Sequence, residues 1–569
     1  MYRCKTIPVV LIVTLALVAC SHDMPAPTSS PTHPAASASR PSENEPRRLD
    51  KSRAEINGAI AIQDAKRAAP AAEAVTGLAA MPRDIRYPSE PVNRENYAHF
   101  DDNPVKRVAE APVSTFSIDV DTGAYANVRR LLNRGQLPPQ DAVRVEEMIN
   151  YFAYDYPLPT DKSRPFSVTT EIAPTPWNRD THLLRVGLKG YDVSPERLPA
   201  ANLVFLVDVS GSMNSPDKLP LLKSGLTLLV QQLKARDRVA IAVYAGASGV
   251  VLESTPGDQH AKIISALERL SAGGSTNGGA GIRLAYALAE QGYIAGGINR
   301  VLLATDGDFN VGTVNFEALK DLIAQKRQSG ISLTTLGFGT GNYNDHLMEQ
   351  LADAGNGNYA YIDTLNEANK VLVSEMASTL QTIAKDVKIQ LEFNPAVVAE
   401  YRLVGYENRA LKREDFNNDK IDAGDIGAGH TVTALYEITL AGGKGARIEP
   451  LRYGGSSVVE GKKDELAWLR LRYKLPDANQ SLLIEQPIAR ATIKRDIAQA
   501  SPDLRFAAAV AVFGQLLRGG KYTNEFGYEE VLRLAQDARG KDGFGYRGEF
   551  TTLVNLAKSL DGGSRSAKR

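Results

Sequence analysis

Apolar runs of strand length alternate with helical patterns through the middle of this chain. The run Val204–Val207 is continuously apolar, which is typical of a strand buried on both faces. Apolar residues then recur at helical spacing over Leu219–Leu233, and a second strand-like run follows at Val239–Tyr244. The repeated alternation predicts an α/β fold, a Rossmann-like, doubly wound and mostly parallel sheet over residues 201–380. We expect further helices near residues 263–270, 282–288 and 319–328, and strands near 301–304 and 331–338.

A pattern of period two flanks this α/β segment on both sides. In residues 466–473, one face carries Leu469, Leu471 and Tyr473, and the other carries Trp468 and two arginines. Such alternation indicates a strand with one buried and one solvated face. The simplest architecture inserts the α/β domain into a β-sandwich whose strands come from both flanks. Similar strand-like stretches lie at residues 166–172, 183–188, 387–393, 432–440 and 481–484.

The two outer regions are mainly helical. Residues 96–160 contain one short strand, 115–120, before a helical pattern, and residues 506–517 and 528–538 are helical with an end expected to fray after Asp561. The predicted organisation is a signal peptide at 1–19, a disordered tether at 20–95, a helical region at 96–160, a β-rich domain at 161–200 and 381–500, the α/β domain at 201–380, and a C-terminal helical region at 501–569.

The N-terminus has the layout of a signal peptide. Arg3 and Lys5 precede an apolar run, Ile7–Val18, that is too short to span a bilayer comfortably. The run ends in Leu-Val-Ala-Cys, which resembles the lipobox of bacterial lipoproteins. That resemblance implies that Cys20 is lipidated and becomes the new N-terminus, and the following Ser21 implies the outer membrane, facing the periplasm. An ordinary secretory signal with an incidental Cys20 is the alternative. A tether rich in Pro, Ser, Ala and Thr follows.

Charge balance, cysteine usage and the absence of certain motifs argue against several functions. Lys plus Arg equals Asp plus Glu at 66 each, so no overall field attracts nucleic acid. The chain has two cysteines, Cys4 in the predicted signal peptide and Cys20, so we expect no disulfide. The glycine-rich loops lack the lysine of a Walker motif, which argues against a nucleotide, and no serine-hydrolase elbow is present.

Oxygen-bearing side chains follow three strands of the predicted parallel sheet. Asp208, Ser210 and Ser212 lie in DVSGS, Thr276 lies in GGSTNGGAG, and Asp306 lies in ATDGD. Because the carboxyl ends of parallel strands share one edge, these side chains can converge. Two carboxylates and three hydroxyls form a hard oxygen environment suited to Mg²⁺, Mn²⁺ or Ca²⁺ rather than to zinc.

These motifs resemble the metal-ion-dependent adhesion site of von Willebrand factor type A domains in order and spacing. The resemblance implies that Ser210, Ser212 and Thr276 bind the metal through hydroxyls, and that Asp208 and Asp306 bind directly or through water. Three further stretches, at residues 110–132, 304–312 and 414–437, are similar to a YfbK-like bacterial subfamily of type A lipoproteins. The insertion into a β-sandwich also resembles inter-α-trypsin inhibitor heavy chains. In integrin relatives a terminal helix shifts on binding; residues 365–383 are the candidate for that helix here, and the sequence does not say whether it shifts.

Two other acidic motifs miss their families' patterns. FSIDVDTG resembles the opening of haloacid-dehalogenase-type phosphatases, with Asp119 and Asp121 in place, but Thr122 stands one position early. We favour Asp121 or Thr122 as the cap of the following helix. The acid-rich stretch 415–425 has the density of a calcium loop but lacks the EF-hand's glycine and glutamate, so we favour a polar loop between strands.

Three functions remain open. The preferred hypothesis is not an enzyme but a lipid-anchored envelope protein that binds an acidic residue of a protein partner through the divalent ion. The alternatives are a metal-dependent hydrolase of phosphoesters and a metal-independent envelope scaffold. The sequence does not identify the partner.

Overall fold

The computed structural model describes residues 94–118, 121–161, 163–194, 196–274, 278–307, 316–452 and 462–567, all within one unit, Arg86–Arg569. Among these residues, no helix has both the length and the apolar character needed to cross a bilayer. The predicted signal peptide, Cys20 and most of the predicted tether lie outside the described residues.

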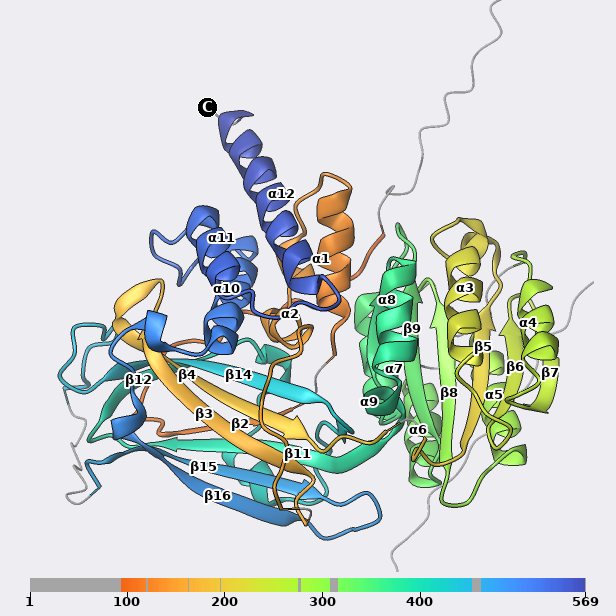
Figure 1. Cartoon of the computed structure of the whole chain (residues 1–569), viewed down its shortest axis with the longest axis horizontal. Coiled ribbons are helices and arrows are strands. Elements are labelled where there is room, and N and C mark those ends of the chain that lie inside the picture. The colour runs from red at the N-terminus through yellow and green to blue at the C-terminus, as the bar shows by residue number, and fades with distance from the viewer. Residues whose placement is uncertain are drawn as a thin grey trace, which may run out of the picture. The chain divides into compact units, whose positions relative to one another are not determined.

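The central domain contains one sheet with the strand order β10-β9-β8-β5-β6-β7 (Figure 1). All neighbouring strands are parallel except β6 and β7, which are antiparallel. The α/β prediction is therefore confirmed. The strands are β5 (Ala201–Asp208), β6 (Arg238–Tyr244), β7 (Ser248–Pro256), β8 (Ile298–Thr305), β9 (Ser332–Phe338) and β10 (Tyr359–Ile362).

Helices cover both faces of this sheet because alternate residues of the buried strands point in opposite directions. In β5, Phe205 and Val207 pack with α3 and α4, whereas Val204 and Leu206 pack with α5 and α6. This explains why the whole strand is apolar. The helices are α3 (Leu219–Val230), α4 (His260–Glu268), α5 (Gly278–Gln291), α6 (Phe316–Gln328), α7 (Asp345–Ala354), α8 (Leu365–Asn369) and α9 (Met376–Leu380), with a π-helical turn, Lys370–Ser374, between the last two.

Two further sheets face each other and enclose a second core. Strands from both sides of the central domain pair directly, β4 with β14, as the insertion hypothesis requires. In β15 the expected alternation is present, with Leu469, Leu471 and Tyr473 buried. One sheet contains β1 (Lys106–Arg107), β12 (Val398–Val404), β14 (Thr431–Leu440), β4 (Asn178–Gly190) and β3 (Phe166–Thr175); the other contains β2 (Val113–Ser117), β13 (Ile426–Gly427), β11 (Thr382–Phe393), β15 (Glu465–Lys474) and β16 (Leu482–Ala489).

A layer of helices covers the outer face of the first sheet (Figure 1). Both ends of the described chain contribute to this layer, since Phe152, Phe506 and Phe550 belong to one core. Residues of β4 and β14 such as Leu183 and Leu435 belong to the same core, which places the layer on this sheet. The helices are α1 (Gly123–Asn133), α2 (Val145–Asn150), α10 (Pro502–Leu517), α11 (Tyr528–Asp537) and α12 (Tyr546–Ala567).

Several sequence predictions need correction. Helix α12 continues past Asp561 instead of fraying there, and the last helix of the central domain ends at Leu380, because strand β11 already begins at Thr382. Strand β12 was not predicted, since Glu400 and Arg402 interrupt its apolar pattern. Both are buried, and Arg402 forms an ion pair with Glu437 of β14 at 3.0 Å.

The predicted cap of helix α1 is also wrong. Neither Asp121 nor Thr122 caps the helix with its side chain; instead Glu147 Oε2 accepts a hydrogen bond from Ala124 N at 2.8 Å. Asp121 turns away because its Oδ1 accepts from Tyr359 N, at 2.7 Å. A carboxylate from helix α2 therefore takes the role that local sequence assigned to Asp121.

Candidate metal centre

Four of the five predicted site residues meet at the carboxyl edge of the central sheet. Asp208 ends strand β5, and its Oδ1 accepts a hydrogen bond from Ser210 N at 2.9 Å. Ser210 Oγ lies 3.0 Å from Ser212 Oγ, and the Ser212 hydroxyl is hydrogen-bonded to the carboxylate of Asp306, which follows strand β8. These four side chains thus form one continuous group, as the topology predicted.

The fifth predicted residue, Thr276, lies outside the described residues. The start of its loop does approach the site, because Gly211 N donates to Gly274 O at 3.0 Å and Gly273 N donates to Val209 O at 2.7 Å. The role of Thr276 as a ligand stays a prediction.

Local backbone geometry fixes the loop that carries Asp306. Gly307 has a φ of +85°, and a Cβ built there would lie 2.4 Å from Asn344 N. Only glycine can occupy this position without displacing the neighbouring loop. The sharp turn lets the chain leave strand β8 while the Asp306 side chain remains fully buried.

The site has a buried floor and an exposed rim. Asp208 and Asp306 are each 0% exposed, and Ser210 is 2% exposed, whereas Ser212 is exposed to solvent. A small ligand can therefore reach the side on which Ser212 lies.

The two carboxylates have different electrostatic surroundings. Burial raises the pKa of Asp208 to about 6, although hydrogen bonds from Ser210 and Thr305 oppose this shift. Burial also acts to raise the pKa of Asp306, but the ammonium of Lys218, together with hydrogen bonds from Ser212 and Asn342, holds that pKa below its usual value. At neutral pH both groups are therefore mainly carboxylates, which is the form that binds cations.

The residues that hold these carboxylates were not predicted from the sequence. Thr305 Oγ1 and Tyr244 OH donate to Asp208 Oδ2, at 2.8 and 3.3 Å. Lys218 Nζ and Asn342 Nδ2 donate to Asp306 Oδ2, at 2.8 and 3.1 Å. Asn342 was detectable in principle, because its loop follows strand β9 at the same edge of the sheet. Lys218 left no signal in the sequence.

The donor set fits a hard divalent cation. Mg²⁺ holds oxygen ligands at about 2.1 Å in octahedral geometry, which separates neighbouring ligands by about 3.0 Å. The two serine hydroxyl oxygens are 3.0 Å apart. Asp208, Ser210, Ser212 and Asp306 would hold the ion, and the ion would supply a positive charge that attracts an anionic ligand.

A second acidic cluster lies elsewhere among the described residues. Ligand atoms of Asp121, Glu147 and Glu349 all lie within 4.8 Å of one another, and burial raises the pKa of each. Guanidinium groups already occupy this cluster: Arg144 pairs with Glu147, and Arg409 Nη2 lies 2.7 Å from Glu349 Oε1 and 3.3 Å from Asp121 Oδ2. The pairs of Arg409 with Glu349 and of Arg144 with Asp345 join the central domain to the flanking regions.

This arrangement does not favour the phosphatase alternative. Asp119 lies outside the described residues, and Asp121 is 2% exposed, with both carboxylate oxygens engaged by Tyr359 N and Arg409. A buried carboxylate held in this way is not presented to a substrate as a nucleophile.

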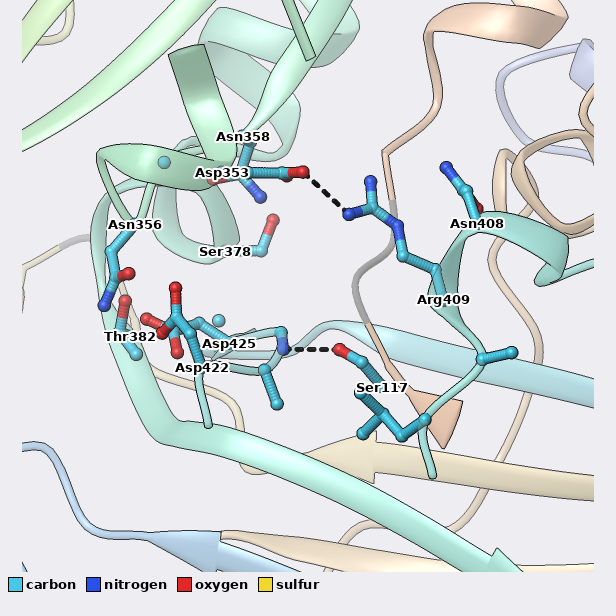
Figure 2. Close-up of a pocket in the computed structure, with 16 residues that line it drawn as sticks. Ser117, Asp353, Asn356, Asn358, Ser378, Thr382, Asn408, Arg409, Asp422 and Asp425 are labelled. Carbon is cyan, nitrogen blue, oxygen red and sulfur yellow. Dashed lines mark hydrogen bonds and ion pairs between the residues drawn. The ribbon is translucent and has the colours of Figure 1, made fainter. Parts of the chain in front are cut away.

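A pocket of about 190 Å³ adjoins the same ion pairs (Figure 2). Asp422 and Asp425 point into it, and Arg409 Nη1 binds Asp353 Oδ2 at 2.8 Å on another side. Burial raises the pKa of Asp425 to about 7. Both aspartates belong to the acid-rich stretch 415–425. Asp422 pairs with Arg327, and Asp425 accepts a hydrogen bond from Asp386 N at 3.2 Å, which agrees with a polar loop.

The fold and the residues at the sheet edge define a von Willebrand factor type A protein. The family model described as von Willebrand factor type A domain matches residues 202–375, the model described as von Willebrand factor matches residues 91–185, and the model for the C-terminal part of uncharacterized protein YfbK matches residues 378–560. The chain is 52% identical to uncharacterized protein YfbK of Escherichia coli over 472 residues, which cover 82% of this chain and 81% of that protein. It therefore belongs to the YfbK family.

More distant similarities cover smaller parts of the chain. Inter alpha-trypsin inhibitor heavy chain 4 of Mus musculus is 28% identical over 165 residues, covering 26% of this chain and 17% of that protein. A solved von Willebrand factor type A protein from Catenulispora acidiphila aligns with a TM-score of 0.38 and 16% identity, covering 68% of this chain and 89% of that one.

Proposed function

We propose that this protein binds an acidic residue of a protein partner through a divalent ion held by Asp208, Ser210, Ser212, Thr276 and Asp306. Type A domains commonly mediate protein–protein interaction. The observation that carries the proposal is that two serine hydroxyls, 3.0 Å from each other, lie in one group with two buried carboxylates. Ser212 of this group is exposed to solvent. Such an ion keeps a coordination position for an incoming carboxylate. Mg²⁺ is the preferred ion, with Mn²⁺ or Ca²⁺ as alternatives.

A binding role is favoured over hydrolysis by how the site carboxylates are used. Asp208 accepts from Thr305 and Tyr244, and Asp306 accepts from Lys218 and Asn342. Carboxylates held as acceptors in this way are poorly placed to take a proton from an attacking water. We therefore propose that the site is not catalytic.

Capture of partners from envelope extract, with Mg²⁺ or with EDTA, tests this function. Wild-type protein should retain a specific partner in Mg²⁺ and lose it in EDTA, and Asp208→Ala should not retain it. Asp258→Ala is the matched control, because Asp258 is an exposed carboxylate of the same domain that lies outside the site. Equal capture in EDTA would instead support the scaffold. Cleavage of p-nitrophenyl phosphate by wild type and not by Asp208→Ala would support the hydrolase.

We also propose that the mature protein is anchored in the outer membrane by lipid on Cys20. The lipobox-like sequence supports this location. Cys20→Ala should move the protein from the membrane fraction to the soluble fraction, and Cys4→Ala should not, because Cys4 lies in the segment to be removed. Membrane retention of Cys20→Ala would contradict the anchor.

A further inference from the structure

Lys218 places a buried ammonium beside the candidate metal site. It directly precedes helix α3, and 8% of its side chain is exposed. Its Nζ lies 2.8 Å from Asp306 Oδ2 and 3.1 Å from Asn342 Oδ1. Asn342 Nδ2 donates to the same Asp306 oxygen at 3.1 Å. The ammonium and the amide therefore bind one oxygen of a predicted metal ligand together.

The fold reserves the space that this lysine occupies. Gly339 follows strand β9 with a φ of +74°, and a Cβ built there would lie 2.2 Å from Lys218 Cε and 2.3 Å from Lys218 Cγ. The hydroxyl of Tyr361 donates a hydrogen bond to Gly339 O and ties this loop to strand β10. Lys218 is thus a fixed part of the site and not a surface side chain that happens to reach it.

When the divalent ion is bound, the net charge of the site determines which ligand can bind next. Asp208 and Asp306 carry two negative charges, which a divalent ion alone would cancel. Lys218 adds a positive charge, so the three side chains with the ion keep one net positive charge in a poorly solvated place. A partner carboxylate would neutralise this charge.

We infer that Lys218 is a specificity-determining residue that weakens binding of the ion alone and strengthens binding of the carboxylate that follows it, so that at a given carboxylate concentration the carboxylate tightens ion binding by a larger factor. The ammonium repels the ion when the ion binds alone, and it attracts the carboxylate that completes the complex. Coupling of this kind is reciprocal, so the carboxylate must tighten ion binding by the same factor by which the ion tightens carboxylate binding. This inference rests on the proposed function.

Titration of the full-length protein with Mn²⁺, followed by the electron paramagnetic resonance of free Mn²⁺, tests the inference. Each titration is run in NaCl and again with acetate replacing chloride at equal ionic strength, so acetate is the carboxylate probe. Removing a unit charge near the ion in Lys218→Met should tighten Mn²⁺ binding without acetate by about tenfold. It should also reduce the factor by which acetate tightens Mn²⁺ binding.

Lys223→Met is the matched control. Lys223 lies on the same helix, and its Nζ donates to Glu268 O at 2.7 Å and to Leu270 O at 3.0 Å, with no contact to the site. Its Mn²⁺ affinity and acetate effect should equal those of wild type. Lys218→Arg keeps the charge, so it should bind Mn²⁺ as weakly as wild type does. If Lys218 acted only as a structural contact, Lys218→Met and Lys218→Arg would change Mn²⁺ binding alike.

The outcomes separate this inference from the proposed function. If wild type does not bind Mn²⁺, both are overturned. If wild type binds Mn²⁺ but folded Lys218→Met binds it no more tightly, or shows an unchanged acetate effect, the inference alone is overturned. Thermal unfolding of each variant establishes that it is folded, and Lys218→Gln gives a second test of charge removal if Lys218→Met is unstable.

Discussion

Two acidic regions of this protein look alike in composition but have opposite chemistry. At the domain interface, Glu147 and Glu349 are paired with Arg144 and Arg409, whose charges are permanent. At the sheet edge, the carboxylate of Asp208 meets only hydroxyls and a backbone N–H among its hydrogen-bond partners. Asp306 at the same edge pairs with Lys218, but one lysine neutralises only one of the two carboxylates, so Asp208 stays available to an exchangeable cation.

The comparison also shows why acid density is a poor guide to metal sites. The interface cluster brings ligand atoms of three carboxylates within 4.8 Å of one another, whereas the sheet edge contributes two carboxylates. Its side chains are already neutralised by guanidinium groups that the chain itself supplies. The edge site is distinguished by its hydroxyls and by the exposure of Ser212.

The largest expected effect comes from removing a fixed cation at the interface. Arg144 is 2% exposed and contacts Glu147, Asp345 and Glu349. Arg144→Met leaves the buried carboxylates of Glu147 and Asp345 without their guanidinium partner, which should lower the free energy of unfolding by about 3–5 kcal/mol. Urea unfolding followed by circular dichroism measures the change.

A surface arginine provides the control for this prediction. The Arg134 side chain is 47% exposed, and its Nη2 lies 3.3 Å from Asp217 Oδ2. Arg134→Met should change the free energy of unfolding by less than about 1 kcal/mol. If Arg144→Met is no more destabilising than Arg134→Met, the interface ion pairs do not hold the two regions together.

These two regions were predictable from the sequence to different degrees. Asp208 and Asp306 were found because each follows an apolar run, and the ends of parallel strands share an edge. The interface was not found, because Arg144 meets Asp345 across 201 residues and no local pattern records such a pair. The same reason hid Lys218, whose contact with Asp306 spans 88 residues and depends on the space left by Gly339.

Strand β12 and the cap of helix α1 were not predicted correctly from the sequence for a related reason. Glu400 is buried, but it accepts hydrogen bonds from Arg447 N and Ile448 N, both at 2.8 Å, so a charged residue occupies a strand without penalty. Glu147 reaches the α1 terminus from another helix. Hydrophobic patterns report which positions face a core, and they do not report which distant polar group will satisfy a buried charge.

A smaller effect is expected at the polar pocket beside the interface. Burial raises the pKa of Asp425 from its usual value of 3.8 to about 7. Between these pH values the Asp425 carboxyl keeps its proton in the folded protein but has lost it in the unfolded chain. The stability that this carboxyl contributes is therefore present below pH 3.8 and is lost as the pH rises through 7. The full shift corresponds to about 4 kcal/mol, but Asp425 is only partly buried, so Asp425→Asn should be more stable than wild type by about 1–2 kcal/mol above pH 7, with no difference near pH 4.

Urea unfolding of both proteins across this pH range measures the difference in the free energy of unfolding. Asp258→Asn changes an exposed carboxylate and should follow wild type at every pH. A stability gain for Asp425→Asn that does not depend on pH would show that the titration of Asp425 is not its cause.

The smallest expected effect concerns the exchangeable cation. Mg²⁺ at about ten times its dissociation constant should stabilise the folded central domain by about 1.4 kcal/mol, because it binds the folded site and not the unfolded chain. Differential scanning calorimetry with Mg²⁺ and with EDTA should show this gain in wild type and in Asp258→Ala, but not in Asp208→Ala. Arg144→Met should keep the gain if it folds, since Arg144 contacts only interface acids among its ion pairs. If Mg²⁺ also stabilises Asp208→Ala, the ion binds elsewhere, and the distinction between fixed and exchangeable cations fails at the sheet edge.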